Sequence, residues 1–176
     1  MNTNNDDVLE TLTQKNKEFS QKQKDELIKH VNGQNPKIAV LTCADSRVIP
    51  EFIFQADIGE LFVVRVAGNI AVDETVIDSL EYAVDHLHVS HLIILAHTHC
   101  GAVKAAEETK NPDSLLLSEI QESFPLDKNH ELANLHRQIS LLPQRSQIIK
   151  KAIVNDSLTL VSALYHLKSG IVEFLE

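Results

Sequence analysis

The sequence predicts an α/β protein: a mainly parallel β-sheet flanked by helices, with N-terminal helices and a C-terminal antiparallel hairpin at the sheet edge. Two observations predict this class. The runs "KIAVLT", "LFVVRVA" and "HLIILA" are short, apolar and bounded by turn residues, as buried strands are. Stretches with helical spacing of apolar residues separate the runs. The strands and helices therefore alternate, which is the order that builds a parallel sheet covered by helices.

The first element is helical and covers residues 6 to 32, in one or two segments, because its apolar residues are compatible with a helical stripe. Gly33 and Pro36 end it, since glycine favours a helix C-terminus and proline cannot continue the helix. Residues 37 to 42 then form the first strand, and "VIPEFIFQA" allows a short helix. The β-branched run at 61 to 67 is the second strand.

The remaining elements follow in the same alternation. Residues 73 to 88 form a helix with acidic residues in its first turn, and residues 91 to 96 form the third buried strand. Helical patterns then cover 101 to 109, 114 to 122 and 129 to 152. The end, "LTLVSALYHLKSGIVEFLE", reads as strand, turn and strand. No repeat or linker divides the chain, so we expect a single domain over residues 1–176.

Charge and hydropathy exclude several classes of protein. The chain has 176 residues, 43% of them hydrophobic, and a net charge of -9, which argues against a nucleic-acid or anionic-membrane partner. No apolar run approaches the 18 or so residues that a membrane span needs. The polar, acidic start "MNTNNDDVLE" lacks the pattern of a secretory signal. We therefore expect a cytoplasmic protein.

The two cysteines stand at the ends of two predicted strands. Cys43 follows the first strand, and His97 and Cys100 follow the third. Because sites in open α/β sheets form outside the carboxyl ends of the strands, these three side chains are expected to meet. Two thiolates and an imidazole are good ligands for Zn²⁺, and three protein ligands leave a position open for water, as in catalytic sites. The alternative is that both cysteines are merely small buried hydrophobic residues.

Asp45 and Arg47 flank this predicted site. An arginine fork can hold a carboxylate in a fixed orientation, and a held carboxylate can accept the proton of a metal-bound water or orient the resulting hydroxide. The alternative interpretation is an ion pair in a surface turn, which contributes little to stability.

With these residues, the chain resembles the β-class carbonic anhydrases, in the compact form of that family. The resemblance implies that Cys43, His97 and Cys100 bind zinc and that Asp45 and Arg47 form a catalytic dyad. It covers residues 8 to 175. The motifs that carry it are "CADSR", "HTHCG", "GELFVVRVAGN", "SLEYAVDHLHV", "CGAVKAA", "SALYHLKSGIVEFL" and "NKEF".

The resemblance also implies a substrate pocket. It assigns Gln34 to the pocket from across a dimer interface, and places Phe62, Ala67 and Tyr82 at positions that line it. Gly101 would bring its backbone close to the substrate. The alternatives are that Phe62 and Tyr82 are core residues and that Gln34 is a loop residue.

The function that the resemblance implies is the reversible hydration of CO₂ to bicarbonate by a zinc-bound hydroxide, in a homodimer or a higher even homo-oligomer. One alternative is a carbonyl sulfide or carbon disulfide hydrolase on the same scaffold. The other is a non-catalytic zinc-binding or thiol-sensing protein, which the intact Asp45 and Arg47 pair argues against. The sequence leaves open whether Asp45 pairs with Arg47 or occupies the fourth position on the metal.

Overall fold

The computed structural model describes residues 5–175, and its contacts divide the chain into two compact units at Gln34. The first unit holds α1 (Asn5–Lys22) and α2 (Lys24–His30). The predicted helix at 6 to 32 is therefore present as two segments. The first four residues of the predicted polar N-terminus lie outside the described part. A single domain over residues 1–176 stays a prediction.

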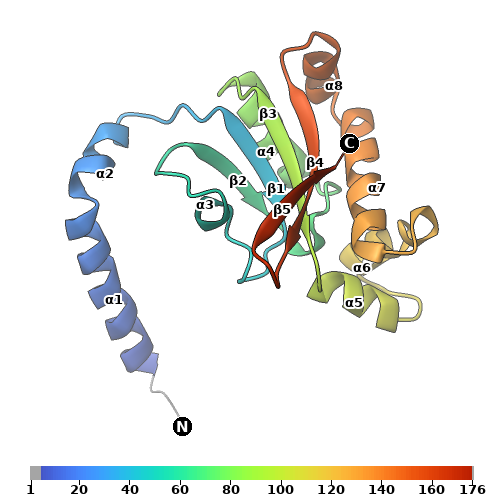
Figure 1. The fold of residues 1–176 in the computed structure, drawn as a ribbon, viewed down its shortest axis with the longest axis horizontal. Helices are drawn as coiled ribbons and strands as arrows, with labels where there is room; N and C mark the ends of the chain where they lie inside the picture. Colours follow the sequence, from blue (N-terminus) through green and yellow to red (C-terminus); the bar gives the residue numbers. More distant parts are fainter. Residues whose placement is uncertain (1–4, 176) are drawn as a thin grey trace. The chain divides into compact units, whose positions relative to one another are not determined.

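The second unit is built on one five-stranded sheet in the order β2-β1-β3-β4-β5 (Figure 1). The strands β1, β2, β3 and β4 are parallel, and β5 runs antiparallel to β4. The predicted fold class is therefore confirmed, with its C-terminal hairpin at the sheet edge. The strands are β1 (Ile38–Thr42), β2 (Leu61–Arg65), β3 (His91–His97), β4 (Thr159–His166) and β5 (Ile171–Leu175).

The helices agree with the predicted ranges except at residues 129 to 152, where one helical pattern forms two helices. Ser146 has an extended backbone (φ -122°, ψ 114°), which ends the first helix, and its hydroxyl accepts a hydrogen bond from the amide of Ile149 in the second. The helices are α3 (Pro50–Ile53), α4 (Glu74–Asp85), α5 (Gly101–Glu108), α6 (Leu115–Gln121), α7 (His130–Arg145) and α8 (Gln147–Val154), with short 3₁₀ turns η1 (Ala67–Asn69) and η2 (Phe124–Leu126).

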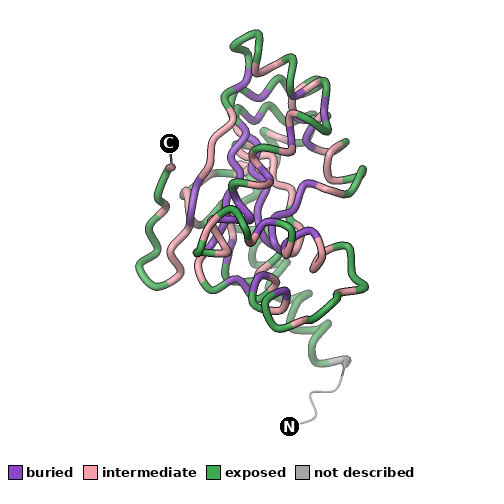
Figure 2. The backbone as a smooth tube through the Cα atoms, turned by 90° about the vertical axis from the view of Figure 1, so that its right-hand side faces the viewer, coloured by how far each residue is buried: buried purple, intermediate pink, exposed green. Residues whose placement is uncertain are grey.

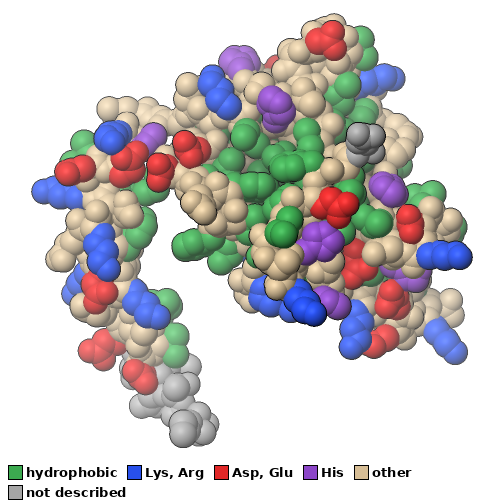
Figure 3. Space-filling model, viewed as in Figure 1, with side chains coloured by type: hydrophobic (Ala, Val, Ile, Leu, Met, Phe, Trp, Pro, Cys, Tyr) green, Lys and Arg blue, Asp and Glu red, His purple; other side chains and the backbone are tan. Residues whose placement is uncertain are grey.

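The two faces of the sheet are covered differently. On one face, strand residues such as Leu41 and Ile94 pack against α4, α7 and α8 and form the largest core cluster. On the other face, Val40, Ile93 and Leu95 pack with residues of α3 and of the C-terminal hairpin. Hydrophobic side chains gather over this second face at the surface (Figure 3). Strand β5 at the edge is largely exposed, whereas the central strands are buried (Figure 2).

Among residues 5–175, no helix is long and apolar enough to cross a lipid bilayer.

Candidate metal centre

The site lies where the strand order reverses. The chain goes from β1 outward to β2 and then returns to β3 on the other side of β1, so the carboxyl ends of β1 and β3 form the switch point of the sheet, where sites in such folds lie. Cys43 follows the last residue of β1, and His97 is the last residue of β3. The hydroxyl of Thr42 donates to the carbonyl oxygen of Leu95 at 2.9 Å and ties these two strand ends together.

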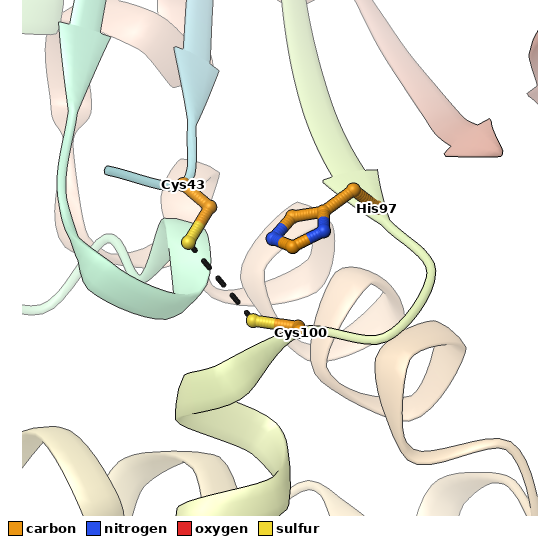
Figure 4. A group of neighbouring side chains, drawn as sticks. All are labelled: Cys43, His97 and Cys100. Atoms are coloured by element: carbon orange, nitrogen blue, oxygen red, sulfur yellow. Dashed lines mark hydrogen bonds between the residues drawn. The ribbon is translucent and has the colours of Figure 1, made fainter. Parts of the chain in front are cut away.

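Three potential ligands meet at this switch point. The donor atoms of Cys43, His97 and Cys100 all lie within 4.8 Å of one another, and all three residues are buried (Figure 4). The two sulfur atoms are 3.9 Å apart. Among the described residues, this is the one group of three or more His, Cys, Asp or Glu side chains arranged closely enough to hold a metal.

The state of His97 fits a metal ligand. Its Nδ1 lies 3.0 Å from the carbonyl oxygen of Thr98, and because a carbonyl only accepts, Nδ1 carries the proton and donates it. In the neutral imidazole, which is the form that binds a metal, the other nitrogen, Nε2, then keeps its lone pair. Nε2 is buried and has no hydrogen-bond partner. A buried acceptor without a partner costs free energy, and a metal ion would satisfy it.

The two thiols influence each other's ionisation. The Cys100 thiol stabilises a thiolate at Cys43 and lowers the pKa of Cys43, against the effect of burial. The same pairing, together with burial, raises the pKa of Cys100. Burial alone would lower the pKa of His97, but the neighbouring Cys43 raises it overall. Two thiolates at this distance would repel each other unless a cation lay between them, so this chemistry also fits a zinc ligand set.

The turn η1 supplies a further contact to the site. The backbone amide of Gly68 donates to Cys43 Sγ at 3.3 Å. Gly68 has φ of +67°, and a Cβ atom there would lie 2.7 Å from Ile120 Cδ1. This left-handed backbone conformation favours glycine, and any side chain here would force the end of the Ile120 side chain to move.

The predicted pair of Asp45 and Arg47 is formed. Arg47 Nε donates to Asp45 Oδ1 at 2.9 Å, and Arg47 Nη2 donates to Oδ2 at 2.7 Å. The amide of Arg47 donates to Oδ1 as well. These bonds hold the pKa of Asp45 well below its usual range. Asp45 Oδ2 lies 4.0 Å from His97 Nε2, so the held carboxylate borders the three potential ligands.

Three residues that the sequence analysis did not single out support this arrangement. Arg65 Nη2 donates to the carbonyl oxygen of Asp45 at 2.7 Å. Glu131 accepts from the amide of His99 at 3.0 Å, and so holds the turn between His97 and Cys100. Gly68 is the third. Arg65 and Gly68 lie in the quoted "GELFVVRVAGN" stretch, but their roles depend on backbone contacts that residue type does not reveal.

The residues predicted to line a pocket are spread more widely. Ala67 opens η1, and Gly101 opens α5 directly after Cys100. Phe62 packs on the core cluster beneath α4, and its ring centroid is 6.2 Å from that of Tyr82, which is exposed. Gln34 is exposed and belongs to the first unit. Their substrate contacts stay a prediction.

A mainly parallel sheet with two cysteines and a histidine at its switch point defines a metalloprotein of the zinc type. Comparison with known proteins agrees. The family model described as carbonic anhydrase matches residues 38–131. Carbonic anhydrase 2 of Mycobacterium tuberculosis is 35% identical over 153 residues, which cover 78% of this chain and 73% of that protein.

Solved structures show the same relationship. The β-carbonic anhydrase CafA of Aspergillus fumigatus superposes with a TM-score of 0.84 at 26% identity, covering 97% of this chain and 91% of that one. The Coccomyxa β-carbonic anhydrase, solved with acetazolamide, gives a TM-score of 0.82 at 26% identity, covering 96% and 84%. The chain belongs to the β-carbonic anhydrase family. This family uses zinc, and the group of Cys43, His97 and Cys100 can hold it.

Proposed function

We propose that this protein catalyses the reversible hydration of CO₂ to bicarbonate, with zinc held by Cys43, His97 and Cys100. The observation that carries the proposal is the juxtaposition of these three donors with a carboxylate that Arg47 holds 4.0 Å from His97 Nε2. A structural zinc site uses four protein ligands and needs no such carboxylate. A zinc ion here would supply a Lewis acid that activates water at neutral pH.

Asp45 and Arg47 have separate roles beside the potential metal ligands. Asp45 Oδ1 accepts from the amide and Nε of Arg47, whereas Oδ2 accepts only from Nη2. A carboxylate oxygen has two lone pairs, so Oδ2 keeps one with which to accept a hydrogen bond from water beside the ligands. Arg47 keeps the Asp45 carboxylate ionised and hydrogen-bonded to its guanidinium group. In this arrangement Asp45 would orient the attacking water and would not itself become a metal ligand.

A direct comparison of substrates tests the proposal. Purified zinc-loaded protein should hydrate CO₂ in a stopped-flow assay, and a sulfide-release assay on the same preparation with carbonyl sulfide and carbon disulfide should show a far lower rate. The relatives named above are carbonic anhydrases, which favours CO₂ over the sulfur analogues. Sulfide release faster than CO₂ hydration would reverse the assignment. Activity with neither substrate would favour the thiol-sensing alternative.

We also propose that two copies of this chain form a homodimer, or a higher even oligomer. The support is apolar surface in both units. Helix α1 exposes Leu9 and Leu12, with 65% and 58% of their surface accessible. In the second unit, Phe52 on α3 is 79% exposed beside the less covered sheet face. Monomeric proteins rarely leave large contiguous apolar patches uncovered. The predicted role of Gln34, which would enter the pocket from across a dimer interface, also requires a second copy.

We expect Phe52→Asp to weaken self-association. A charge on this apolar surface would be buried in the dimer without a partner, and the dissociation constant should rise more than about tenfold. Sedimentation or light scattering at micromolar concentration measures this change. Val154→Asp is the matched control, because Val154 is 72% exposed but lies at the end of α8, which packs on the other face. A wild-type monomer with full activity would contradict the proposed assembly.

The proposed location is the cytoplasm, and the proposed partners are small molecules. Both cysteines are free thiols in the structure, and a reducing compartment preserves such a ligand pair. The net charge of -9 disfavours binding to nucleic acid or to an anionic membrane surface. Fractionation of cells that express the tagged protein tests the location.

A further inference from the structure

Helix α7 carries two uncharged polar side chains that are almost completely buried. Asn134 is 1% exposed and Gln138 is 0% exposed. They are four residues apart, so they lie on the same side of the helix. Burying an amide is unfavourable unless its hydrogen bonds are made, and on a helix that otherwise buries Ala133, Leu135 and Leu142, apolar residues would be the simpler choice.

Both side-chain amides form hydrogen bonds with the loop that contains η1. Asn134 Nδ2 donates to the carbonyl oxygen of Gly68 at 2.7 Å, and Gln138 Oε1 accepts from the amide of Ala71 at 2.8 Å. Gln138 Nε2 donates to Asn134 Oδ1 at 3.1 Å, which links the two side chains. Arg145 adds a bond from Nη1 to the carbonyl oxygen of Ala71 at 2.7 Å. Helix α7 therefore fixes the loop at two points.

The same loop reaches the potential metal ligand. The amide of Gly68 donates to Cys43 Sγ at 3.3 Å, while the carbonyl of Gly68 is held by Asn134. With one peptide group held on each side, Gly68 has little freedom to turn its amide away from the sulfur. A continuous chain of hydrogen bonds thus runs from Gln138 through Asn134 and Gly68 to Cys43.

We infer that Asn134 and Gln138 are positioning residues of the metal centre: they hold the Gly68 amide against Cys43 Sγ and so set the orientation and donor strength of that ligand. An N–H donor withdraws electron density from a thiolate and fixes its direction. Loss of such outer partners typically costs about 10- to 100-fold in metal affinity or activity. The inference rests on the zinc site of the proposed function, but its test requires no catalytic turnover.

The test uses Asn134→Ala and Gln138→Met in the full chain. Each variant is loaded with zinc to follow release to a chelator, and with cobalt(II) to record the sulfur-to-metal charge-transfer absorption. We expect zinc release at least about tenfold faster than in the wild type and a displaced absorption band. Gln138→Glu keeps an acceptor for the Ala71 amide, and because burial favours the neutral carboxyl it can also donate to Asn134 Oδ1, so it should release zinc at a rate closer to the wild type. If Asn134→Ala fails to fold, the two Gln138 variants carry the same comparison.

Ser146→Ala is the matched control. Its hydroxyl is equally buried and bonds Glu81 and the amide of Ile149, so its loss weakens the fold without touching the loop at 66 to 72. Zinc release and the cobalt band should stay at wild-type values in this variant. Release rates that follow only the melting temperatures of all variants, or an unmoved cobalt band, would overturn the inference. A protein that binds zinc as expected but fails to hydrate CO₂ would contradict the proposed function alone.

Discussion

Asp45→Asn is expected to lower the rate of CO₂ hydration by about 10²- to 10⁴-fold while zinc stays at about one per chain. The amide keeps the size of the side chain but has only one acceptor oxygen, so it cannot both fill the Arg47 fork and accept a hydrogen bond from water. Stopped-flow hydration together with metal analysis of the same sample measures both quantities.

Two further variants make this result interpretable. Glu173→Gln neutralises a carboxylate on β5 that pairs with His166 at the surface, and this variant should hydrate CO₂ at the wild-type rate. Arg47→Ala leaves Asp45 without its fork, so we expect the carboxylate to turn toward the three ligands, with zinc retained and activity lost. If Asp45→Asn kept near wild-type activity at every pH, the pair would be structural.

Cys100→Ser is expected to reduce zinc affinity by more than about 100-fold and to abolish activity. This loss exceeds the typical effect of removing a residue that only hydrogen-bonds a metal ligand. A serine hydroxyl stays protonated near neutral pH, so it cannot replace a thiolate ligand. Metal content after dialysis against a weak chelator, followed by competition titration, measures the loss.

His99→Asn is the control for this variant. His99 lies in the same turn and is exposed, and its positive φ of 56° is one that asparagine tolerates. It stands outside the group that can hold a metal, so zinc content should not change. Full zinc occupancy in Cys100→Ser would remove Cys100 from the ligand set.

The sheet was predictable from sequence because buried parallel strands are continuous apolar runs. The strands around Val40 and Ile93 begin and end within a residue or so of the predicted limits. The second strand ends earlier than predicted, at Arg65, because Ala67 and Gly68 turn the chain into η1. The break at Ser146 was missed, because a serine between two apolar helical patterns can equally lie on the polar face of one long helix.

The inner part of the site was predictable for a related reason. Strand ends at a switch point bring Cys43, His97 and Cys100 together whatever the details of packing. The outer part was not, because it depends on backbone groups and on polar residues that are buried. Polar residues such as Asn134 and Gln138 ordinarily lie on the solvent side of an amphipathic helix, and only the structure shows that they bond the loop at Gly68 and Ala71.

The separation of the potential metal ligands along the chain has an expected kinetic consequence. Cys43 and Cys100 are 57 positions apart and meet through the parallel pairing of β1 and β3. Such long-range contacts require loop closure before they can form, so the unfolded chain has no complete site that could capture the ion. Zinc should therefore stabilise the native protein by slowing its unfolding. The refolding rate should be almost the same with and without zinc in the refolding buffer.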